Sequence, residues 1–341
     1  MNYLVTGSAG FIGNHVALEL LKAGHTVVGV DAVTDYYSPK LKEARLDRLR
    51  EFASFTEARI NLADAEALDA VFAAHKPEIV INLAAQAGVR YSLEYPREYV
   101  KSNLEGFLNI LECCRHHDVK HLLFASTSSV YGANTLQPFN EHVPADHPLT
   151  FYAASKRANE LMAHSYSHLF KFAVTGLRFF TVYGPWGRPD MALYKFAKGI
   201  LEDTPIDIYN NGEMSRDFTY IDDIVDGIIK LSTVLPEPDP TWNGDDPDPC
   251  RSGVAAFRVY NIGNSKVVPL MTYIETLEKK LGKKAIKNFM PMQKGDVPST
   301  CADTSDLETA TGFKPDTSVE DGISAFVDWY LDWRASEETE T

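Results

Sequence analysis

Tyr152 and Lys156 are the two residues of this sequence whose types and spacing point most directly to proton transfer. They stand in Tyr152-Ala-Ala-Ser-Lys156, which follows Pro148 and begins a predicted helix. Residues four apart share one helical face, with Cβ atoms about 5–6 Å apart. A phenol with a pKa of about 10 is a poor base at neutral pH, but an adjacent ammonium favours the phenolate. Alone, such a pair is weak evidence, because Tyr and Lys on exposed helix faces commonly just solvate the surface.

A row of hydroxyl side chains, Ser126-Thr127-Ser128-Ser129, stands just beyond a predicted strand. The carboxyl end of a parallel strand is where ligands bind in an α/β sheet. From that position Thr127 could align a substrate hydroxyl with the Tyr152 base. We therefore predict that Tyr152, Lys156 and Thr127 are the catalytic residues.

The segment Gly7-Ser-Ala-Gly10-Phe-Ile-Gly13 follows the first predicted strand and opens the first predicted helix. Glycines permit a tight turn there and let backbone N–H groups approach a pyrophosphate, which the helix dipole also favours. As a bare string the motif is weak, because such turns are common for steric reasons alone. Asp31 strengthens it, since it ends the second strand, 24 residues after Gly7. Its carboxylate can bind a ribose 2′-hydroxyl and repel a 2′-phosphate, so we expect NAD rather than NADP.

Further candidates for the cofactor site follow later strands. Asn61 and Leu62 come after the third strand, and Leu83-Ala84-Ala85 after the fourth, on the rim where dinucleotides lie. Lys156 is also expected to hydrogen-bond the nicotinamide ribose. The predicted cofactor-binding residues are Gly7, Gly10, Phe11, Ile12, Gly13, Asp31, Asn61, Leu62, Leu83, Ala84, Ala85, Tyr152 and Lys156.

These residues need a parallel sheet to bring them together, and the first half of the sequence predicts one. Short β-rich runs alternate with longer helical patterns, which favours a Rossmann-type doubly wound α/β sheet with a smaller C-terminal α/β substrate-binding lobe. The predicted strands are Tyr3 to Val5, Thr26 to Val30, Phe55 to Ile60, Glu78 to Leu83, His121 to Ala125 and Phe172 to Leu177.

The pattern loosens after about residue 178, which suggests a second lobe. We expect an NAD-binding domain over 1–177 and a mainly substrate-binding lobe over 178–335, with segments near 219–235 and 258–263 returning to the first domain. The Pro- and Asp-rich segment 236–253 is predicted to be a surface loop. Thr317 and Glu320 have capping-box spacing before a final amphipathic helix, and the tail 336–341 is expected to be frayed.

Length and composition limit the number of domains and the kinds of partner. At roughly 150 residues per domain, 341 residues correspond to about two domains. The formal net charge of −14 and the lack of a basic stripe argue against nucleic acid or a membrane as a partner. No run of about 18 apolar residues exists. The four cysteines lack the paired spacing of a metal site or a disulfide framework, and the chain enters a predicted strand at once, so we expect no metal and a cytoplasmic protein.

Together, the glycine segment, Asp31, Thr127, Tyr152 and Lys156 resemble an extended short-chain dehydrogenase/reductase of the nucleotide-sugar epimerase and dehydratase branch. The resemblance covers nearly the whole chain, and longer stretches make it most similar to the UDP-glucuronate 4-epimerases. Those stretches are Asp35 to Asp47, Ala84 to Ser92, Leu177 to Met191 and Arg216 to Asp223.

That resemblance implies an NAD-dependent isomerase that interconverts UDP-glucuronate and UDP-galacturonate through a transient 4-keto sugar. Tyr152 would take the sugar 4-hydroxyl proton, and a homodimer would form through helices near Glu98 to His117 and Ala153 to Leu169. A planar guanidinium can grip a carboxylate with two hydrogen bonds, so Arg188 would keep the uronate from decarboxylating. The implied substrate-binding residues are Ser128, Ser129, Arg188, Arg216, Thr181, Arg90 and Gln293, the last where galactose epimerases carry a second phosphate-binding Arg.

Two other functions stay open at this point. A UDP-glucuronate decarboxylase that forms UDP-xylose typically carries Ser-Thr-Ser-Glu-Val-Tyr-Gly, whereas this chain has Ser129 in place of the Glu. A non-catalytic NAD-sensing module could use the same fold, but it would not need Thr127, Tyr152 and Lys156.

Two residues at the predicted cofactor rim depart from the family pattern. Asn61 stands in place of the usual Asp, and Asn82 in place of the usual His, and both differences bear on the affinity for NAD.

Overall fold

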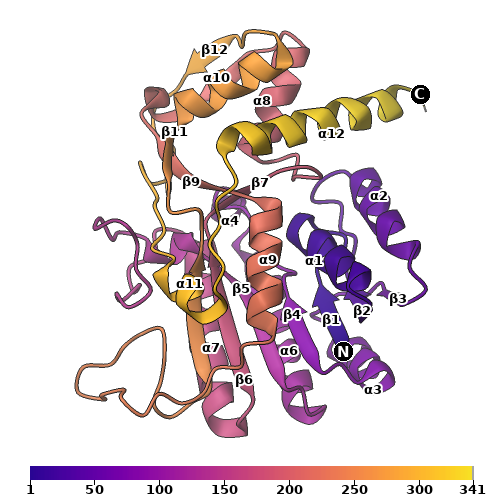
Figure 1. The fold of residues 1–341 in the computed structure, drawn as a ribbon, viewed down its shortest axis with the longest axis vertical. Helices are drawn as coiled ribbons and strands as arrows, with labels where there is room; N and C mark the ends of the chain where they lie inside the picture. Colours follow the sequence, from indigo (N-terminus) through magenta and orange to yellow (C-terminus); the bar gives the residue numbers. More distant parts are fainter. Residues whose placement is uncertain (340–341) are drawn as a thin grey trace.

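A seven-stranded parallel sheet forms the centre of the protein, as seen in the computed structural model, which describes residues 1–339 (Figure 1). Its strand order is β10-β6-β5-β4-β1-β2-β3, and every neighbouring pair runs parallel. This confirms the predicted doubly wound α/β class. The strands are β1 Asn2–Thr6, β2 Thr26–Val30, β3 Phe55–Ala58, β4 Ile79–Asn82, β5 His121–Thr127, β6 Ala173–Phe179 and β10 Phe257–Ile262.

Helices cover both faces of this sheet, because successive side chains of each strand point to opposite sides. Tyr3 and Val5 of β1 join a core with helices on one face, whereas Leu4 joins the core on the other. The first face is covered by α1 Phe11–Lys22, α2 Pro39–Arg50, α9 Ile221–Ser232 and α11 Ser305–Thr311. The second face is covered by α3 Ala65–His75, α6 Gly106–His116 and α7 Phe151–Phe170.

A smaller lobe sits beyond the carboxyl ends of the strands, at the top of Figure 1. Its core includes Phe218 and Tyr273, whose rings stack at a centroid distance of 3.9 Å. It contains the helices α8 Ala192–Leu201, α10 Leu270–Leu281 and α12 Val319–Thr339, the three-stranded sheet of β11 Val267–Pro269, β9 Ser215–Tyr220 and β7 Thr181–Tyr183, and the pair β12 Lys287–Phe289 and β8 Ile206–Ile208.

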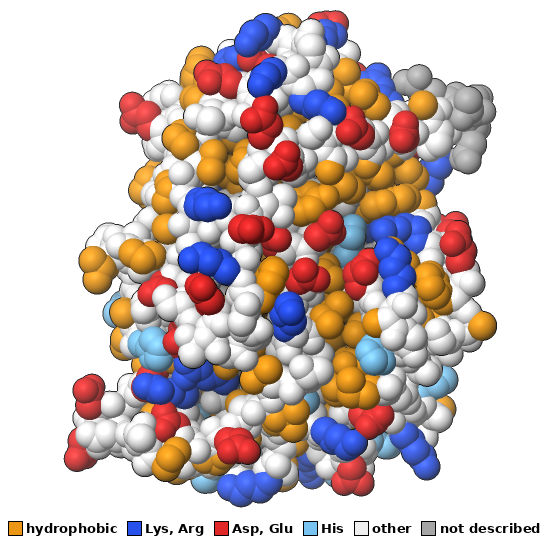
Figure 2. All heavy atoms as spheres, in the orientation of Figure 1, with side chains coloured by type: hydrophobic (Ala, Val, Ile, Leu, Met, Phe, Trp, Pro, Cys, Tyr) orange, Lys and Arg blue, Asp and Glu red, His pale blue; other side chains and the backbone are white. Residues whose placement is uncertain are grey.

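Several short helical elements lie between these helices and strands. They are α4 Tyr91–Glu94, α5 Pro96–Tyr99, a π-helical stretch Val100–Glu105 that leads into α6, and 3-10 turns at Ser128–Tyr131 and Tyr209–Gly212. The chain between α9 and β10 holds no helix or strand. Within the described residues, no helix is long and apolar enough to cross a membrane. Figure 2 shows acidic and basic side chains interspersed over one face of the molecule.

The cap of the C-terminal helix differs from its prediction. Its capping hydroxyl is Ser318, which accepts from the Asp321 N–H at 3.1 Å and donates to that carboxylate at 2.6 Å, so the pair is one residue later than Thr317 and Glu320. The Thr317 hydroxyl instead bonds Asp223 of α9. α12 is described as far as Thr339, and residues 340–341 of the tail that the sequence predicts to be frayed lie outside the described part.

Candidate active site

A cavity of about 1070 Å³ lies between the carboxyl ends of the sheet strands and the smaller lobe. It exceeds the ~300–1,000 Å³ of a site for one drug-sized ligand. Its walls come from the turn after β1, the segments after β2 and β4, the end of β5, the start of α7, and α8 and β9 of the smaller lobe. The volume is therefore large enough for two ligands side by side, one against each lobe.

The glycine turn after β1 packs too closely for side chains. Gly7 has φ +74°, and a Cβ there would lie 2.9 Å from the Ala84 backbone nitrogen. A Cβ on Gly13 would lie 2.2 Å from the Gly7 carbonyl oxygen. α1 begins at Phe11 without a side-chain cap, so no side chain occupies its first N–H groups. The turn thus fits a pyrophosphate bound by backbone N–H groups and the helix dipole.

Asp31 connects this turn to the end of β2. Its carboxylate accepts hydrogen bonds from the Ala9 N–H at 3.0 Å and the Val33 N–H at 2.8 Å. The side chain also lines the cavity, so its remaining lone pairs can accept from a ribose hydroxyl. The side-chain amide oxygen of Asn61, Oδ1, already accepts from the Ala63 N–H at 3.0 Å. All of the predicted cofactor residues line the cavity, and the set fits NAD.

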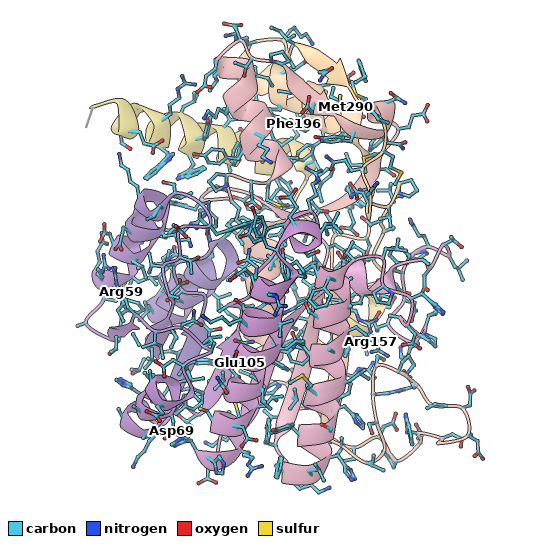
Figure 3. All side chains as sticks on the ribbon, turned by 180° about the vertical axis from the view of Figure 1, so that it is seen from behind. Arg59, Asp69, Glu105, Arg157, Phe196 and Met290 are labelled. Atoms are coloured by element: carbon cyan, nitrogen blue, oxygen red, sulfur yellow. The ribbon has the colours of Figure 1, made fainter. Side chains whose placement is uncertain are left out.

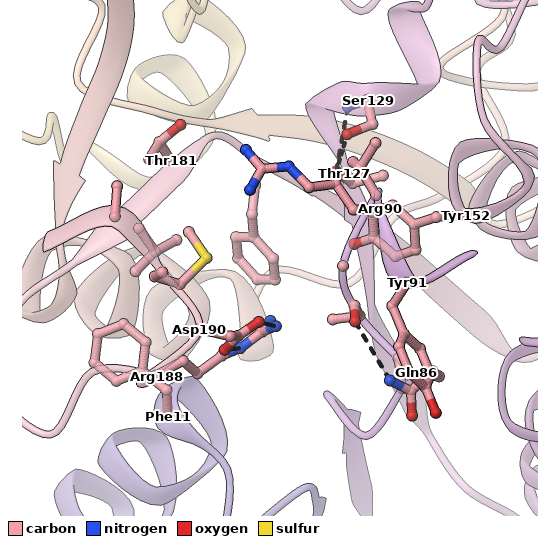
Figure 4. Close-up of a pocket in the computed structure, with 18 of the residues that line it drawn as sticks. Phe11, Gln86, Arg90, Tyr91, Thr127, Ser129, Tyr152, Thr181, Arg188 and Asp190 are labelled. Carbon is pink, nitrogen blue, oxygen red and sulfur yellow. Dashed lines mark hydrogen bonds and ion pairs between the residues drawn. The ribbon is translucent and has the colours of Figure 1, made fainter. Parts of the chain in front are cut away.

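Thr127 and Tyr152 face this cavity from two different elements. Thr127 ends β5, and its Oγ1 accepts from the Ser129 N–H at 3.2 Å. Tyr152 stands in the first turn of α7, which Thr150 caps by accepting from the Ala153 N–H at 3.2 Å. Figure 4 shows Thr127, Ser129 and Tyr152 along one side of the site. The sheet and the helix therefore bring together the hydroxyl pair that the sequence pattern predicts.

The pKa of Tyr152 departs from the expectation based on sequence. Burial raises it, and a hydrogen bond with Thr127 and the charge of Arg188 only partly offset that effect. Burial also lowers the pKa of Lys156 to about 8, against the opposing attraction of Glu160. In the protein alone Lys156 does not bring the Tyr152 pKa below its ordinary value, because the removal of both groups from water dominates.

A buried ion pair holds α7 against the sheet. Arg178 of β6 donates to Glu160 of α7 through Nε and Nη2, each at 2.9 Å, and neither side chain has exposed surface. Ser126, next to Thr127, donates to the same carboxylate at 2.6 Å. Because Glu160 lies one turn beyond Lys156, this network fixes α7 relative to the end of β5.

Three arginines from the predicted substrate set line the cavity, and each has a partner. Arg188 donates to Asp190. Arg216 of β9 donates to Asp296 at 2.7 Å. Arg90 lies over the ring of Tyr209 in the smaller lobe, 4.8 Å from its centroid, and so links the two lobes. Ser128, Ser129 and Thr181 also line the cavity.

Gln293 is the exception among the predicted substrate-binding residues. The three residues after it line the cavity, but Gln293 itself does not. Its side-chain amide oxygen, Oε1, is buried and has no hydrogen-bond partner in the described structure. The prediction rested on the family resemblance alone, which gives a position in the sequence but not the direction of its side chain. Lys294, which follows directly, lines the cavity in its place.

Several residues that the fold brings to the cavity were not among those predicted from the sequence. They include Tyr36 after β2, Asp190 and Lys195 around the start of α8, and Asp296. Asp190 had a signal, since it stands two residues after Arg188 in a Pro-containing turn. Tyr36 and Asp296 are contributed by loops whose course a sequence pattern does not specify, and Lys195 is contributed by α8.

One further cluster of polar side chains lies outside the cavity. His142, Cys250 and Asp306 offer ligand atoms within 4.8 Å of one another. However, His142 Nδ1 bonds Asp248 at 2.6 Å and Nε2 bonds Asp306 at 3.0 Å, and Arg258 also donates to Asp306. The guanidinium already neutralises a carboxylate, so these contacts favour a polar anchor for the loop before β10 over a cation site.

The comparison with known families agrees with this geometry. A model described as the NAD dependent epimerase/dehydratase family matches residues 3–243. The chain belongs to this family. NAD is accordingly its cofactor, and the glycine turn, Asp31 and the rim residues are the groups that fit it.

Individual relatives show which members of the family the chain is similar to. The chain is 55% identical over 333 residues to Protein CapI of Staphylococcus aureus, covering 98% of this chain and 99% of that protein. It is 53% identical over 330 residues to a probable UDP-glucuronate 4-epimerase of Rhizobium meliloti, covering 97% of each. Among solved structures, the UDP-glucuronic acid 4-epimerase of Bacillus cereus in complex with UDP-glucuronic acid and NAD has a TM-score of 0.87 at 33% identity, covering 98% of this chain and 100% of that one. The resemblance found from the sequence is confirmed.

Proposed function

We propose that this protein interconverts UDP-glucuronate and UDP-galacturonate by epimerisation at sugar C4. The relatives named for that activity span almost its full length. The observation that carries the proposal is that one cavity is lined by the glycine turn, by Thr127 and Tyr152, and by Arg188. A dinucleotide site, a proton-transfer pair and a carboxylate-binding cation thus meet in one space.

The proton chemistry belongs to Tyr152 and Thr127. The Tyr152 Oη takes the proton of the sugar 4-hydroxyl and later returns a proton to the same oxygen. Thr127 Oγ1 orients that hydroxyl by hydrogen bonding, and the Lys156 ammonium stabilises the phenolate. When bound, NAD supplies reversible uptake of a hydride from C4. The 4-keto sugar turns between the two half-reactions, so the net redox change is zero.

Arg188 has to protect the sugar during this step. A 4-keto uronate is a β-keto acid, which loses carbon dioxide when its C5–C6 bond aligns with the carbonyl π system. A guanidinium that binds the carboxylate can hold that bond out of alignment. Ser128 and Ser129 line the same cavity and add hydroxyl donors. Arg216, with Lys294 nearby on the cavity wall, is the candidate partner for the UDP diphosphate.

We also propose that two copies pair through α6 and α7. These helices pack against each other on the face turned to the viewer in Figure 3. They leave apolar side chains exposed there, including Leu108 at 40%, Leu161 at 59% and Leu169 at 63%. Exposed apolar side chains on two neighbouring helices are typical of an interface. Sedimentation as a dimer at micromolar concentration supports the proposal, and a monomer at that concentration contradicts it.

Incubation of the purified protein with UDP-glucuronate, followed by proton NMR of the sugar, tests the proposed function. The account predicts UDP-galacturonate at equilibrium with the substrate. UDP-pentose as the main product would identify a decarboxylase. Unchanged substrate with protein that retains NAD would identify a sensing module.

A further inference from the structure

Arg188 already has a carboxylate partner from its own chain. Its Nε donates to Asp190 Oδ1 at 3.0 Å, and its Nη2 donates to Asp190 Oδ2 at 2.5 Å (Figure 4). Both side chains line the cavity and keep 20% and 28% of their surface exposed. This is the two-pronged geometry that planar guanidinium and carboxylate groups favour.

The backbone and a tyrosine hold this pair in place. The Met191 N–H bonds the Arg188 carbonyl at 3.1 Å, which closes the turn that contains both residues. Tyr36 donates from its hydroxyl to Asp190 Oδ2 at 3.3 Å, and its ring packs edge-on against Tyr91 with centroids 5.0 Å apart. Tyr36 belongs to the segment after β2, so Asp190 links the cofactor side of the cavity to the substrate side.

The pair also determines which guanidinium nitrogens remain for a ligand. Asp190 occupies the edge formed by Nε and Nη2. Within residues 1–339, Nη1 has no hydrogen-bond acceptor of the protein, although the side chain lines the cavity. Burial opposes charge on Arg188 and on Asp190, but each charge stabilises the other, so the pKa of Arg188 is raised and that of Asp190 is lowered. Both groups are therefore charged at neutral pH.

We propose that Asp190 is a positioning residue that fixes the plane of Arg188, so that its Nη1 edge meets the substrate carboxylate in one orientation. This inference rests on the proposed function. A freely rotating guanidinium would follow the carboxylate as the keto sugar turns, including into the alignment that releases carbon dioxide. A guanidinium held by Asp190 keeps the carboxylate on one side of the ring. Asp190 thereby favours epimerisation over decarboxylation without touching the substrate itself.

The by-product step balances without an added reagent. The C5–C6 bond breaks, C6 leaves as carbon dioxide, and its electron pair forms the C4–C5 enolate. A proton from water then adds at C5 and gives a 4-keto pentose. This ketone takes back the hydride that was removed from C4 in the first half-reaction, and Tyr152 returns a proton to its oxygen, which gives UDP-pentose. The fraction of UDP-pentose among the products therefore reports how well the carboxylate is held.

Asp190→Asn tests the role, because the amide keeps the shape but turns one acceptor into a donor that faces Arg188. Calorimetric titration of the NAD-loaded protein measures the affinity for UDP-glucuronate and for UDP, which has no carboxylate. We expect UDP-glucuronate to bind about tenfold more weakly, as for loss of a charge-assisted hydrogen bond. The affinity for UDP should stay unchanged, and UDP-pentose should rise. Asp35→Asn, which removes an exposed carboxylate from the segment that carries Tyr36, is the matched control and should resemble the wild type.

Three results would overturn the inference. Equal losses for UDP and UDP-glucuronate would mean a merely structural role. Tighter UDP-glucuronate binding would mean that Asp190 competes with the substrate for Arg188. Unchanged affinity and product ratio would mean that Asp190 has no role. The proposed function fails separately, if the wild type forms no UDP-galacturonate.

Discussion

The Glu160 carboxylate and the Arg178 guanidinium form a bidentate ion pair, and neither side chain has exposed surface. Ser126 adds a third hydrogen bond to the same carboxylate, and Arg157 adds a fourth at 2.8 Å. The Glu160 side chain thus connects α7, the helix that carries Tyr152, to the neighbouring strands β5 and β6. This buried contact therefore holds Tyr152 in position relative to the sheet.

Loss of the Glu160 carboxylate should therefore be costly. In Glu160→Ala the Arg178 charge stays buried without a partner, and we expect the free energy of unfolding to fall by about 3–5 kcal/mol. Asp146→Ala is the matched control, because Asp146 pairs with Arg157 but is 58% exposed, so its loss should cost less than about 1 kcal/mol. Urea unfolding of both variants measures the difference, and equal small losses would contradict this role for Glu160.

The same residue should make stability depend on acid. Burial opposes the charge of Glu160, but Arg178 outweighs it and lowers the pKa of Glu160 from 4.5 to about 2. A carboxyl whose pKa is lower in the folded state contributes stability above its unfolded pKa and loses it as the pH falls toward the folded value. We expect the urea midpoint to drop between about pH 4.5 and about pH 2, and to drop less steeply in Glu160→Gln. Parallel curves for the two proteins would exclude Glu160 as the source.

Removal of the Tyr152 hydroxyl should stop the reaction without loss of binding. Tyr152→Phe lacks the proton acceptor, so kcat should fall by about 10²–10⁴-fold. UDP lacks the sugar whose 4-hydroxyl would meet Tyr152. Its affinity should therefore remain at the wild-type level. Tyr166→Phe is the control, because Tyr166 lies on the same helix and bonds Glu112 away from the cavity. A similar loss of kcat in both variants would point to a structural effect.

Asp31 should control which dinucleotide is held. Asp31→Asn keeps an oxygen that can accept from the Ala9 N–H but removes the charge that repels a 2′-phosphate. We expect the ratio of NAD to NADP affinity to shift toward NADP by roughly tenfold in direct binding measurements. An unchanged ratio would mean that another group of the rim selects the cofactor.

Much of the first domain could be predicted because its signals are local. β2 matches its predicted range, since a buried parallel strand is a short apolar run between polar turns. β3 ends at Ala58 instead of Ile60, and β5 continues to Thr127, because ladder pairing with neighbouring strands decides where a strand stops. The capping hydroxyl moved to Ser318 for a similar reason, since Thr317 is taken by Asp223.

The electrostatics of the site could not be predicted in the same way. The i and i+4 spacing of Tyr152 and Lys156 says nothing of how deeply the fold buries them, and burial decides the direction of both pKa shifts. The resemblance predicts Arg188 as a substrate-binding cation, but its partner Asp190 and the hydroxyl of Tyr36 meet only in the folded chain. Long-range pairings of this kind leave no periodic pattern in a sequence.

In the proposed mechanism, the hydrogen leaves sugar C4 and returns to the same carbon from the other face. This transfer is tested most directly by NMR with UDP-glucuronate deuterated at C4, in ordinary water. The account predicts UDP-galacturonate that retains deuterium at C4, because the hydrogen travels as a hydride and never exchanges with solvent. UDP-galacturonate with ordinary hydrogen at C4 would contradict it.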